Sequence, residues 1–262
     1  MNEGSLAAKR ALVVGAGGGL GSAIAASLAR AGCAVALAGR DLAQLAPLAD
    51  RIGQAAGVRT LPIRIDLGAS GSIAGGVGDA VAALGGLDVL VNAAGRVANG
   101  SFEQVSAREW VESIEVKLLG TLDVIRNALP HLKRAQGTVI TLTGLYGKEP
   151  SPLQIVSGAI NAALANSHKA LATDLAPSGV RVVSLCLGGF LTDRLRTIVE
   201  QAARESGRGT DDELRIRQQG LPMRRYGAPE ELGELVAFLA SSRCRYLDGA
   251  ALVVDGSAAA SV

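Results

Sequence analysis

The apolar residues of the chain fall into short runs that alternate with longer stretches of helical periodicity. The short runs, rich in Val, Ile, Leu and Ala, predict β-strands at residues 11–14, 34–38, 60–65, 89–92, 137–141, 181–185 and 251–254. Most of these runs show no alternation with polar residues, which is typical of strands covered on both faces. The stretches between them predict helices at residues 20–31, 42–55, 73–84, 107–132, 156–175 and 229–240.

This order of strands and helices predicts an α/β fold with a doubly wound parallel sheet of about seven strands and right-handed crossovers. No linker, repeat or low-complexity boundary interrupts the pattern, so residues 1–262 are expected to form a single domain. Residues 190–220 lie outside the rhythm and are charged and amphipathic. We expect them to project from the sheet as a flap that sets substrate specificity.

The composition narrows the class of protein. The chain is 48% hydrophobic and 19% charged with a formal net charge of +2, and no basic stripe suggests a nucleic-acid partner. No run approaches the roughly 18 apolar residues of a membrane span, and the N-terminal segment has no signal-peptide core. Cys33, Cys186 and Cys244 are predicted to be buried and reduced, and two histidines give no basis for a metal centre. These features predict a cytoplasmic protein without a metal.

A glycine-rich turn joins the first predicted strand to the first predicted helix, with the spacing GxxxGxG from residue 15 to residue 21. Glycine permits the positive φ of a tight turn, and a bare backbone lets a diphosphate approach the free N–H groups of the helix N-terminus. The turn is therefore predicted to bind a dinucleotide; a plain tight turn is the alternative. The predicted contacts are Gly15, Gly17, Gly18, Gly19, Leu20 and Gly21.

The end of the second strand bears on the type of dinucleotide. An acid at this position commonly binds the ribose diol of NAD, but Gly39 stands here and Arg40 follows. A guanidinium matches a 2′-phosphate in charge and geometry, which favours NADP(H) over NAD(H). The alternative is that Arg40 is a solvated charge at a strand end.

Further motifs follow the later strands in order. They are Asp66-Leu67, Asn92-Ala93-Ala94-Gly95, Gly188 with Thr192, and the C-terminal stretch from Pro222 to Gly256. With the glycine turn, these motifs resemble the short-chain dehydrogenase/reductase family nearly end to end. The resemblance implies a Rossmann-type fold and an NAD(P)-dependent oxidoreductase. It also implies cofactor contacts at Asp66, Leu67, Asn92, Ala93, Ala94, Gly95, Asn161, Gly188 and Thr192.

The catalytic residues of that family are missing. Its members use a tyrosine, a lysine four residues later, a serine and an asparagine, and this sequence has no tyrosine four residues before a lysine. Alignment to the family puts other residues at the four positions, which here are Lys117, Gly144, Ser157 and Asn161. A hydroxyl such as that of Ser157 is a far weaker acid than a phenol of pKa about 10. Positioned acid–base catalysis contributes about 10²- to 10⁴-fold, so its loss excludes the usual mechanism without excluding turnover.

Three residues are candidates for the missing proton donor: Tyr146, Lys117 and Ser157. Tyr146 follows the fifth strand and could reach a substrate, although a packing role is the alternative. A desolvated Lys117 could have a pKa in a useful range, although a surface or cofactor-linked lysine is the favoured alternative. Ser157 and Asn161 could hydrogen-bond a ligand, whereas His168 is expected to be either a satisfied or an exposed imidazole.

Three functions fit these observations. The first is an NADP(H)-dependent oxidoreductase that acts on a small carbonyl, imine or alcohol by a non-standard proton path. The second is a catalytically silent subunit that pairs with an active sibling, and the third is a non-redox catalyst or sensor. The resemblance implies a homodimer or homotetramer built on the helices predicted at residues 107–132 and 156–175, or a hetero-oligomer with an active family member.

Overall fold

The structure, a computed structural model, describes residues 6–260 of the chain. It confirms the predicted α/β fold, because these residues form a seven-stranded sheet in the order β3-β2-β1-β4-β5-β6-β7 with every neighbouring pair parallel. The strands are β1 (Arg10–Val14), β2 (Ala34–Gly39), β3 (Thr60–Arg64), β4 (Val89–Asn92), β5 (Thr138–Gly144), β6 (Arg181–Leu187) and β7 (Ala251–Val254).

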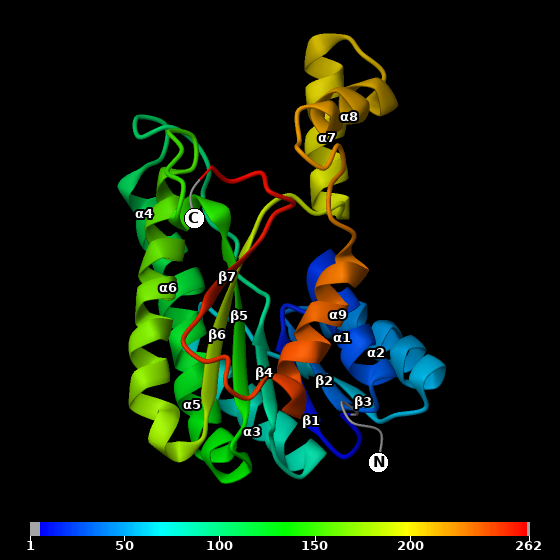
Figure 1. Cartoon of the computed structure of the whole chain (residues 1–262), viewed down its shortest axis with the longest axis vertical. Helices are drawn as coiled ribbons and strands as arrows, with labels where there is room; N and C mark the ends of the chain where they lie inside the picture. The colour runs from blue at the N-terminus through cyan, green and yellow to red at the C-terminus, as the bar shows by residue number, and fades with distance from the viewer. Residues whose placement is uncertain (1–5, 261–262) are drawn as a thin grey trace.

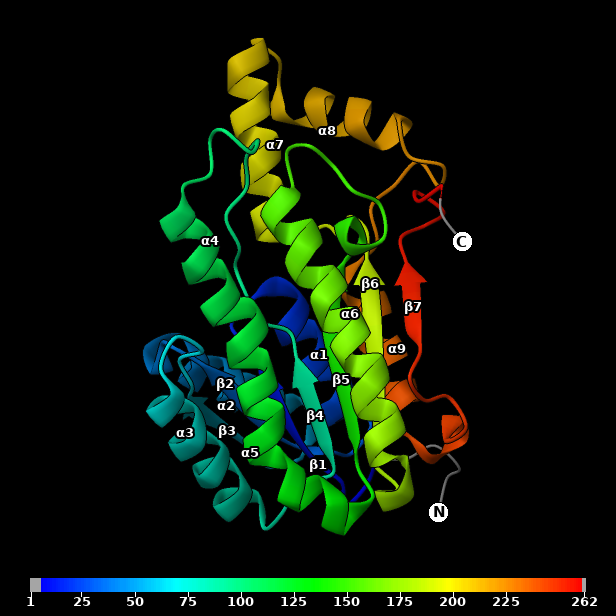
Figure 2. The ribbon, with the colours of Figure 1, turned by 90° about the vertical axis from the view of Figure 1, so that its left-hand side faces the viewer.

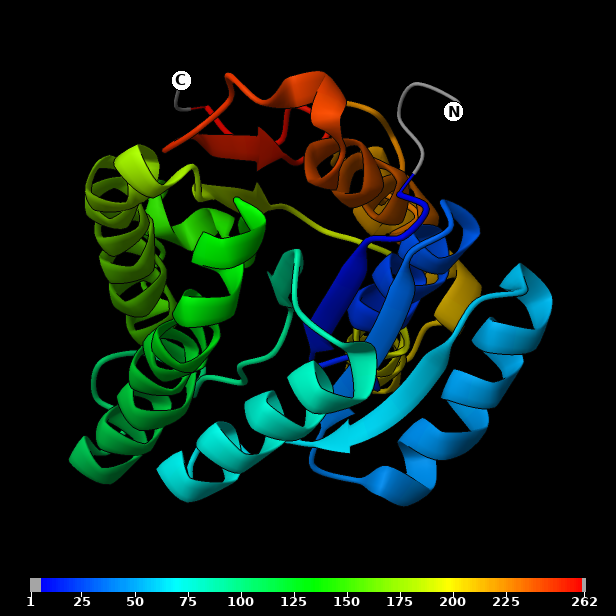
Figure 3. The same ribbon diagram turned by 90° about the horizontal axis from the view of Figure 1, so that it is seen from below.

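Helices cover both faces of the sheet (Figures 1 and 3). Helices α1, α2 and α9 pack on one face, and α3, α5 and α6 pack on the other. The helices are α1 (Gly19–Arg30), α2 (Leu42–Ala56), α3 (Ser70–Leu84), α4 (Ala107–Ser113), α5 (Gly120–Ala135), α6 (Ile155–Leu175), α7 (Asp193–Ser206), α8 (Thr210–Gln219) and α9 (Pro229–Ala240).

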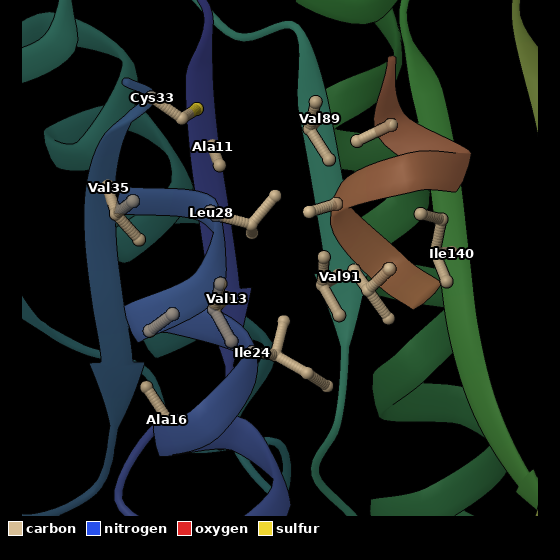
Figure 4. Packing of buried hydrophobic residues seen from close by; sticks show 14 of the residues in the cluster. Ala11, Val13, Ala16, Ile24, Leu28, Cys33, Val35, Val89, Val91 and Ile140 are labelled. Atoms are coloured by element: carbon tan, nitrogen blue, oxygen red, sulfur yellow. The ribbon is translucent and has the colours of Figure 1, made fainter. Parts of the chain in front are cut away.

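The apolar runs of the strands are buried between these layers, which explains why they lack alternation. On one face, Ile24 and Leu28 of α1 lie over Val13 of β1 and Val91 of β4, and all four are fully buried (Figure 4). Burial of each such side chain contributes about 1.5–3 kcal/mol relative to exposure. This packing fixes the start of α1 directly above the carboxyl end of β1.

The order of the strands reverses between β1 and β4, because the chain first builds outward to β3 and then continues from β4 to β7 on the other side. In doubly wound sheets, ligands bind in the crevice beyond the carboxyl ends of the strands at such a switch point. The glycine turn after β1 and the segment after β4 both lie at this crevice.

One predicted helix is interrupted. The continuous α-helix expected at residues 107–132 is wrong, because a π-helical segment, η1 (Ile114–Leu119), separates α4 from α5. A π turn adds a residue to the helical repeat and rotates the side chains that follow, and such turns often occur at functional sites. Here the π turn contains Lys117, whose side chain is buried.

Residues 190–220 contain the helices α7 and α8, which extend beyond the carboxyl ends of the strands (Figures 1 and 2). The base of this segment contacts the glycine turn, since a Cβ atom on Gly19 would lie 3.1 Å from the Cβ of Thr192. Thr192 also caps α7, because its hydroxyl accepts a hydrogen bond from the backbone N–H of Leu195.

The structure allows two of the compositional expectations to be examined. Within residues 6–260, no helix is both long enough and apolar enough to cross a membrane. Cys33 and Cys186 are buried free thiols, whereas Cys244 is only half-buried, so the prediction of burial was wrong for Cys244. Cys244 lies in a short 3₁₀ turn, η4 (Ser242–Cys244), that follows the end of α9, and its thiol donates to the carbonyls of Phe238 and Leu239.

Candidate active site

The glycine turn after β1 has no room for side chains. Gly15 has φ +89°, and a Cβ atom there would lie 2.7 Å from the backbone nitrogen of Ala94. A Cβ on Gly21 would collide with the carbonyl oxygen of Gly15. Helix α1 has no side-chain cap and no acid in its first turn, so its N–H groups and positive dipole end are free for an anion.

A cavity of about 890 Å³ extends from this turn along the switch point. Eight of the residues predicted to bind the cofactor line it, and they follow the ends of four strands, β1, β2, β3 and β4. They are Gly15, Gly17, Gly18, Arg40, Asp66, Leu67, Ala94 and Gly95. The volume and the elongated lining suit a ligand of dinucleotide size.

The other predicted cofactor residues do not line this cavity. Gly19, Leu20 and Gly21 form the first turn of α1, and Ala93 continues β4, where its N–H donates to the carbonyl of Val14. Gly188 packs against Asp255, because a Cβ on this glycine would lie 2.7 Å from the Cβ of Asp255. These residues support the backbone around the cavity but do not line it.

Asp41 explains the geometry at the end of β2. Its carboxylate accepts hydrogen bonds from the N–H groups of Ala43 and Gln44 and caps α2. The guanidinium of Arg40 is exposed at the cavity and has no hydrogen-bond or ion-pair partner among the residues described. The carboxylate at this strand end is therefore engaged by the helix, and the adjacent cation is free to bind an anion.

Lys117 is a buried ammonium at the inner end of the site. Its Nζ donates to the carbonyl oxygen of Ala94 at 2.9 Å and to that of Leu142 at 3.0 Å. Gly95, with φ +120°, leaves the space that the lysine stem occupies, because a Cβ there would overlap the Lys117 side chain. Burial lowers the pKa of Lys117 to about 8. An ammonium has three donors, so one N–H remains beyond the two carbonyls.

A row of buried polar side chains lies beside Lys117. Asn92, Thr141 and Ser184 are in register on neighbouring strands, and the Nδ2 of Asn92 donates to the Oγ1 of Thr141 at 3.3 Å. His168 of α6 joins the row through its Nδ1, which lies 2.8 Å from the Oγ of Ser184. The Oδ1 of Asn92 and the Nε2 of His168 are buried without a protein partner. His168 is therefore buried and not exposed, and its ring is hydrogen-bonded through one of its two nitrogens.

The burial of His168 has a measurable consequence. Desolvation, followed by the charge of Lys117, lowers the pKa of His168 to about 4. We expect NMR titration of the two imidazoles to show one midpoint near pH 4. His131, which is partly exposed, serves as the internal control. A midpoint for His168 above pH 6 would contradict the burial.

Ser157 and Asn161 form a second polar pair on α6. The Nδ2 of Asn161 donates to the Oγ of Ser157 at 3.1 Å and to the Ser157 carbonyl at 2.8 Å. The Asn161 Oδ1 is buried without a partner. Gly144 lies against the pair, because a Cβ on it would lie 2.9 Å from the Asn161 Nδ2. The Asn161 Oδ1 and the Ser157 hydroxyl hydrogen thus have no protein partner, and neither residue lines the cavity.

Tyr146 is placed differently from these residues. It lies in a 3₁₀ turn, η2 (Leu145–Gly147), and its side chain is 41% exposed. Thr143, at the end of β5, turns its hydroxyl inward to the carbonyl of Leu185 and the sulfur of Cys186. The structure therefore brings Ser157 together with Asn161 near Gly144, and leaves Tyr146 at the surface.

Sequence reasoning missed several residues that line the cavities. Gln44 donates from Nε2 to the carbonyl of Gly17 at 3.1 Å, and Arg194 reaches the main cavity from the first turn of α7. Arg64, at the end of β3, lines an adjoining cavity with Arg40. The signal for Arg64 was present, because a strand-end position in a parallel sheet faces the binding edge. Within residues 6–260, no three His, Cys, Asp or Glu side chains gather in a way that could hold a metal ion.

The comparisons with known proteins agree with this geometry. The family described as enoyl-(acyl carrier protein) reductase matches residues 15–257. The oxidoreductase UcpA of Salmonella typhimurium is 32% identical over 256 residues, covering 97% of this chain and 95% of that protein. The 3-oxoacyl-[acyl-carrier-protein] reductase FabG of Aquifex aeolicus is 29% identical, covering 97% and 98%. The chain belongs to the short-chain dehydrogenase/reductase family of oxidoreductases.

Solved structures give the same result. The L-sorbose reductase of Gluconobacter frateurii, determined with NADPH and L-sorbose, superposes with a TM-score of 0.95 at 25% identity, covering 99% of this chain and all of that chain. YwfH, an NADPH-dependent reductase of bacilysin biosynthesis, superposes with a TM-score of 0.90 at 28% identity, covering 97% and 99%.

Proposed function

We propose that this protein is an NADP(H)-dependent oxidoreductase for a small carbonyl compound, imine or secondary alcohol, with a proton path that does not use a tyrosine–lysine pair. The observation that carries the proposal is the cavity of about 890 Å³ that joins the bare glycine turn to the unpartnered Arg40. The NADPH complexes among the structural relatives support the choice of cofactor.

The described residues fit a dinucleotide. The glycine turn and the uncapped start of α1 suit a diphosphate, since no side chain blocks the approach. Asp66 and Leu67 line the cavity where an adenine would lie, and the buried, unpartnered Asn161 Oδ1 could accept a hydrogen bond from a ribose hydroxyl. A nicotinamide bound here would supply or accept a hydride.

Two residues of the chain then orient the substrate oxygen and donate a proton to it. The Ser157 hydroxyl, which already accepts from Asn161, donates to the substrate carbonyl oxygen and orients it. The third N–H of Lys117 supplies the proton that this oxygen gains when a carbonyl becomes an alcohol, and solvent restores it. A pKa of about 8 suits a general acid that works near neutral pH.

This division of roles accounts for the departure of the sequence from the family pattern. By alignment, Lys117 takes the position of the family's asparagine, Ser157 that of its tyrosine and Asn161 that of its lysine, with Gly144 in place of the serine. We propose that the acid moves from the phenol to the ammonium, because the tyrosine position holds only a short aliphatic hydroxyl. The exposed Tyr146 has no part in the step.

The proposal is tested by calorimetry with NADPH and NADH, followed by NADPH oxidation with a panel of small aldehydes, ketones and imines. We expect micromolar binding of NADPH and turnover of at least one apolar carbonyl. Tight NADPH binding with no oxidation across the panel would favour the silent subunit instead. Absence of binding by either dinucleotide would remove the oxidoreductase proposal altogether.

Replacement of Arg40 by alanine is expected to weaken NADPH about tenfold and to leave NADH unchanged. A charge-assisted contact to a phosphate at an exposed site is worth about 1.4 kcal/mol, which is tenfold in Kd. Calorimetry of both dinucleotides against wild type and Arg40→Ala gives the ratio. Equal losses of affinity for NADPH and NADH would show that Arg40 does not bind the 2′-phosphate.

Assembly with an active sibling stays a second proposal. The outward face of α6 carries small exposed side chains at Ala159, Ala162 and Ala170, which would permit close approach of another helix. A second copy of this chain and an active family member are equally compatible with that face. Mass photometry alone and with the sibling separates them, since a homotetramer with no affinity for the sibling would exclude the mixed assembly.

A further inference from the structure

The end of β3 carries a second arginine that the family motifs do not assign. Residues Gly39 of β2 and Arg64 of β3 are register partners at the carboxyl edge of the sheet. Because Gly39 has no side chain, no side chain at the end of β2 separates Arg64 from Arg40, the residue that follows Gly39. Both arginines line one cavity of about 580 Å³, together with Asp41, Leu42 and Ala43.

Both arginines are free to bind. Arg40 and Arg64 are exposed, and neither has a hydrogen-bond or ion-pair partner among residues 6–260. Guanidinium groups at protein surfaces commonly find a carboxylate, and the one carboxylate in this cavity belongs to Asp41. One oxygen of that carboxylate accepts the N–H groups of Ala43 and Gln44 at the start of α2. The cavity therefore presents two unsatisfied cations beside a carboxylate that the helix already binds.

The position of this cavity defines its ligand. Arg40 and Asp41 line both this cavity and the larger one that runs to the glycine turn, so the two spaces meet at the end of β2. A phosphomonoester carries about −1.5 to −2 charges at pH 7 and three acceptor oxygens. Two planar guanidinium forks match that charge and that number of acceptors better than one.

We propose that Arg64 acts with Arg40 as the second half of a two-arginine cradle for the 2′-phosphate of the adenosine ribose. This inference rests on the proposed function. It assigns cofactor discrimination to β3 as well as β2, and makes Arg64 a specificity-determining residue. The nicotinamide end of the site takes no part, so the cradle should bind the adenosine fragment alone.

The test uses the full chain with four probes: NADPH, NADH, 2′,5′-ADP and 5′-AMP. Arg64→Ala should weaken NADPH and 2′,5′-ADP about five- to tenfold and leave NADH and 5′-AMP unchanged. The double variant Arg40→Ala/Arg64→Ala should lose about 100-fold for the phosphorylated probes, so that NADPH and NADH bind alike. Arg64→Lys should recover only part of the loss, because an ammonium lacks the planar fork.

Arg59→Ala is the matched control. Arg59 is exposed and immediately precedes the opposite, amino end of β3. Its replacement by alanine therefore removes the same charge near the same strand without changing the cavity. An equal loss in Arg59→Ala would indicate general electrostatic attraction and would overturn the proposal. Unchanged NADPH affinity in Arg64→Ala would also overturn it while leaving the proposed function intact. Failure of the wild type to bind either dinucleotide would instead contradict the proposed function.

Discussion

Lys117→Met is expected to lower the rate of NADPH-dependent carbonyl reduction by about 10²- to 10⁴-fold, the usual contribution of a positioned general acid. Methionine fills nearly the same volume but has no proton to donate. In the wild type the rate should fall as pH rises through about 8, because the neutral amine cannot act as an acid. The variant should retain its affinity for NADPH, since the lysine bonds to the carbonyls of Ala94 and Leu142 and none of the proposed cofactor contacts uses its side chain.

Lys133→Met is the matched control for this experiment. Lys133 lies exposed in the last turn of α5, far along the chain from the π turn. The substitution removes the same charge without changing the interior of the protein, so the reaction rate and pH profile of this variant should match those of the wild type. If Lys117→Met turns over at the wild-type rate, or keeps the break near pH 8, Lys117 is not the acid. If the reaction rate then falls only in Ser157→Ala, the one role that stays supported is orientation of the substrate by Ser157.

The same lysine is expected to make the stability of the protein depend on pH. Lys117 has a pKa of about 8 in the folded chain and 10.5 as its ordinary value. The unfolded chain therefore binds more protons between these values, so the free energy of unfolding rises with pH across this window. Between pH 7 and pH 10 the wild type should gain roughly 2–3 kcal/mol relative to Lys117→Met.

Urea unfolding at a series of pH values measures this difference without any substrate. The contribution is fully present above pH 10.5 and is lost as the pH falls toward 8. A parallel pH dependence in the wild type and Lys117→Met would mean that the ammonium is hydrated in the folded protein. Lys133→Met should follow the wild type, because the Lys133 side chain is exposed.

The sequence by itself determined the architecture and the glycine turn after the first strand. Continuous apolar runs can be buried on both faces only in a parallel sheet covered by helices, and all seven predicted strands are present. The sequence also predicted the glycine turn, and the structure gives the reason for its glycines: a Cβ atom at Gly15 or Gly21 would collide with backbone atoms. The absence of a tyrosine–lysine pair also follows from the sequence, as no alignment can create it.

Only the tertiary structure decided which polar residues share a site. The periodicity of residues 107–132 predicted one continuous helix and did not show the π turn in which the buried Lys117 lies. Tyr146 and Ser157 were both candidates for the proton donor, and only the structure shows that Tyr146 is exposed whereas Ser157 is buried against Asn161. Arg40 and Arg64 are brought to one cavity by strand pairing. Long-range contacts of this kind depend on register and burial, which a local pattern of residues does not contain.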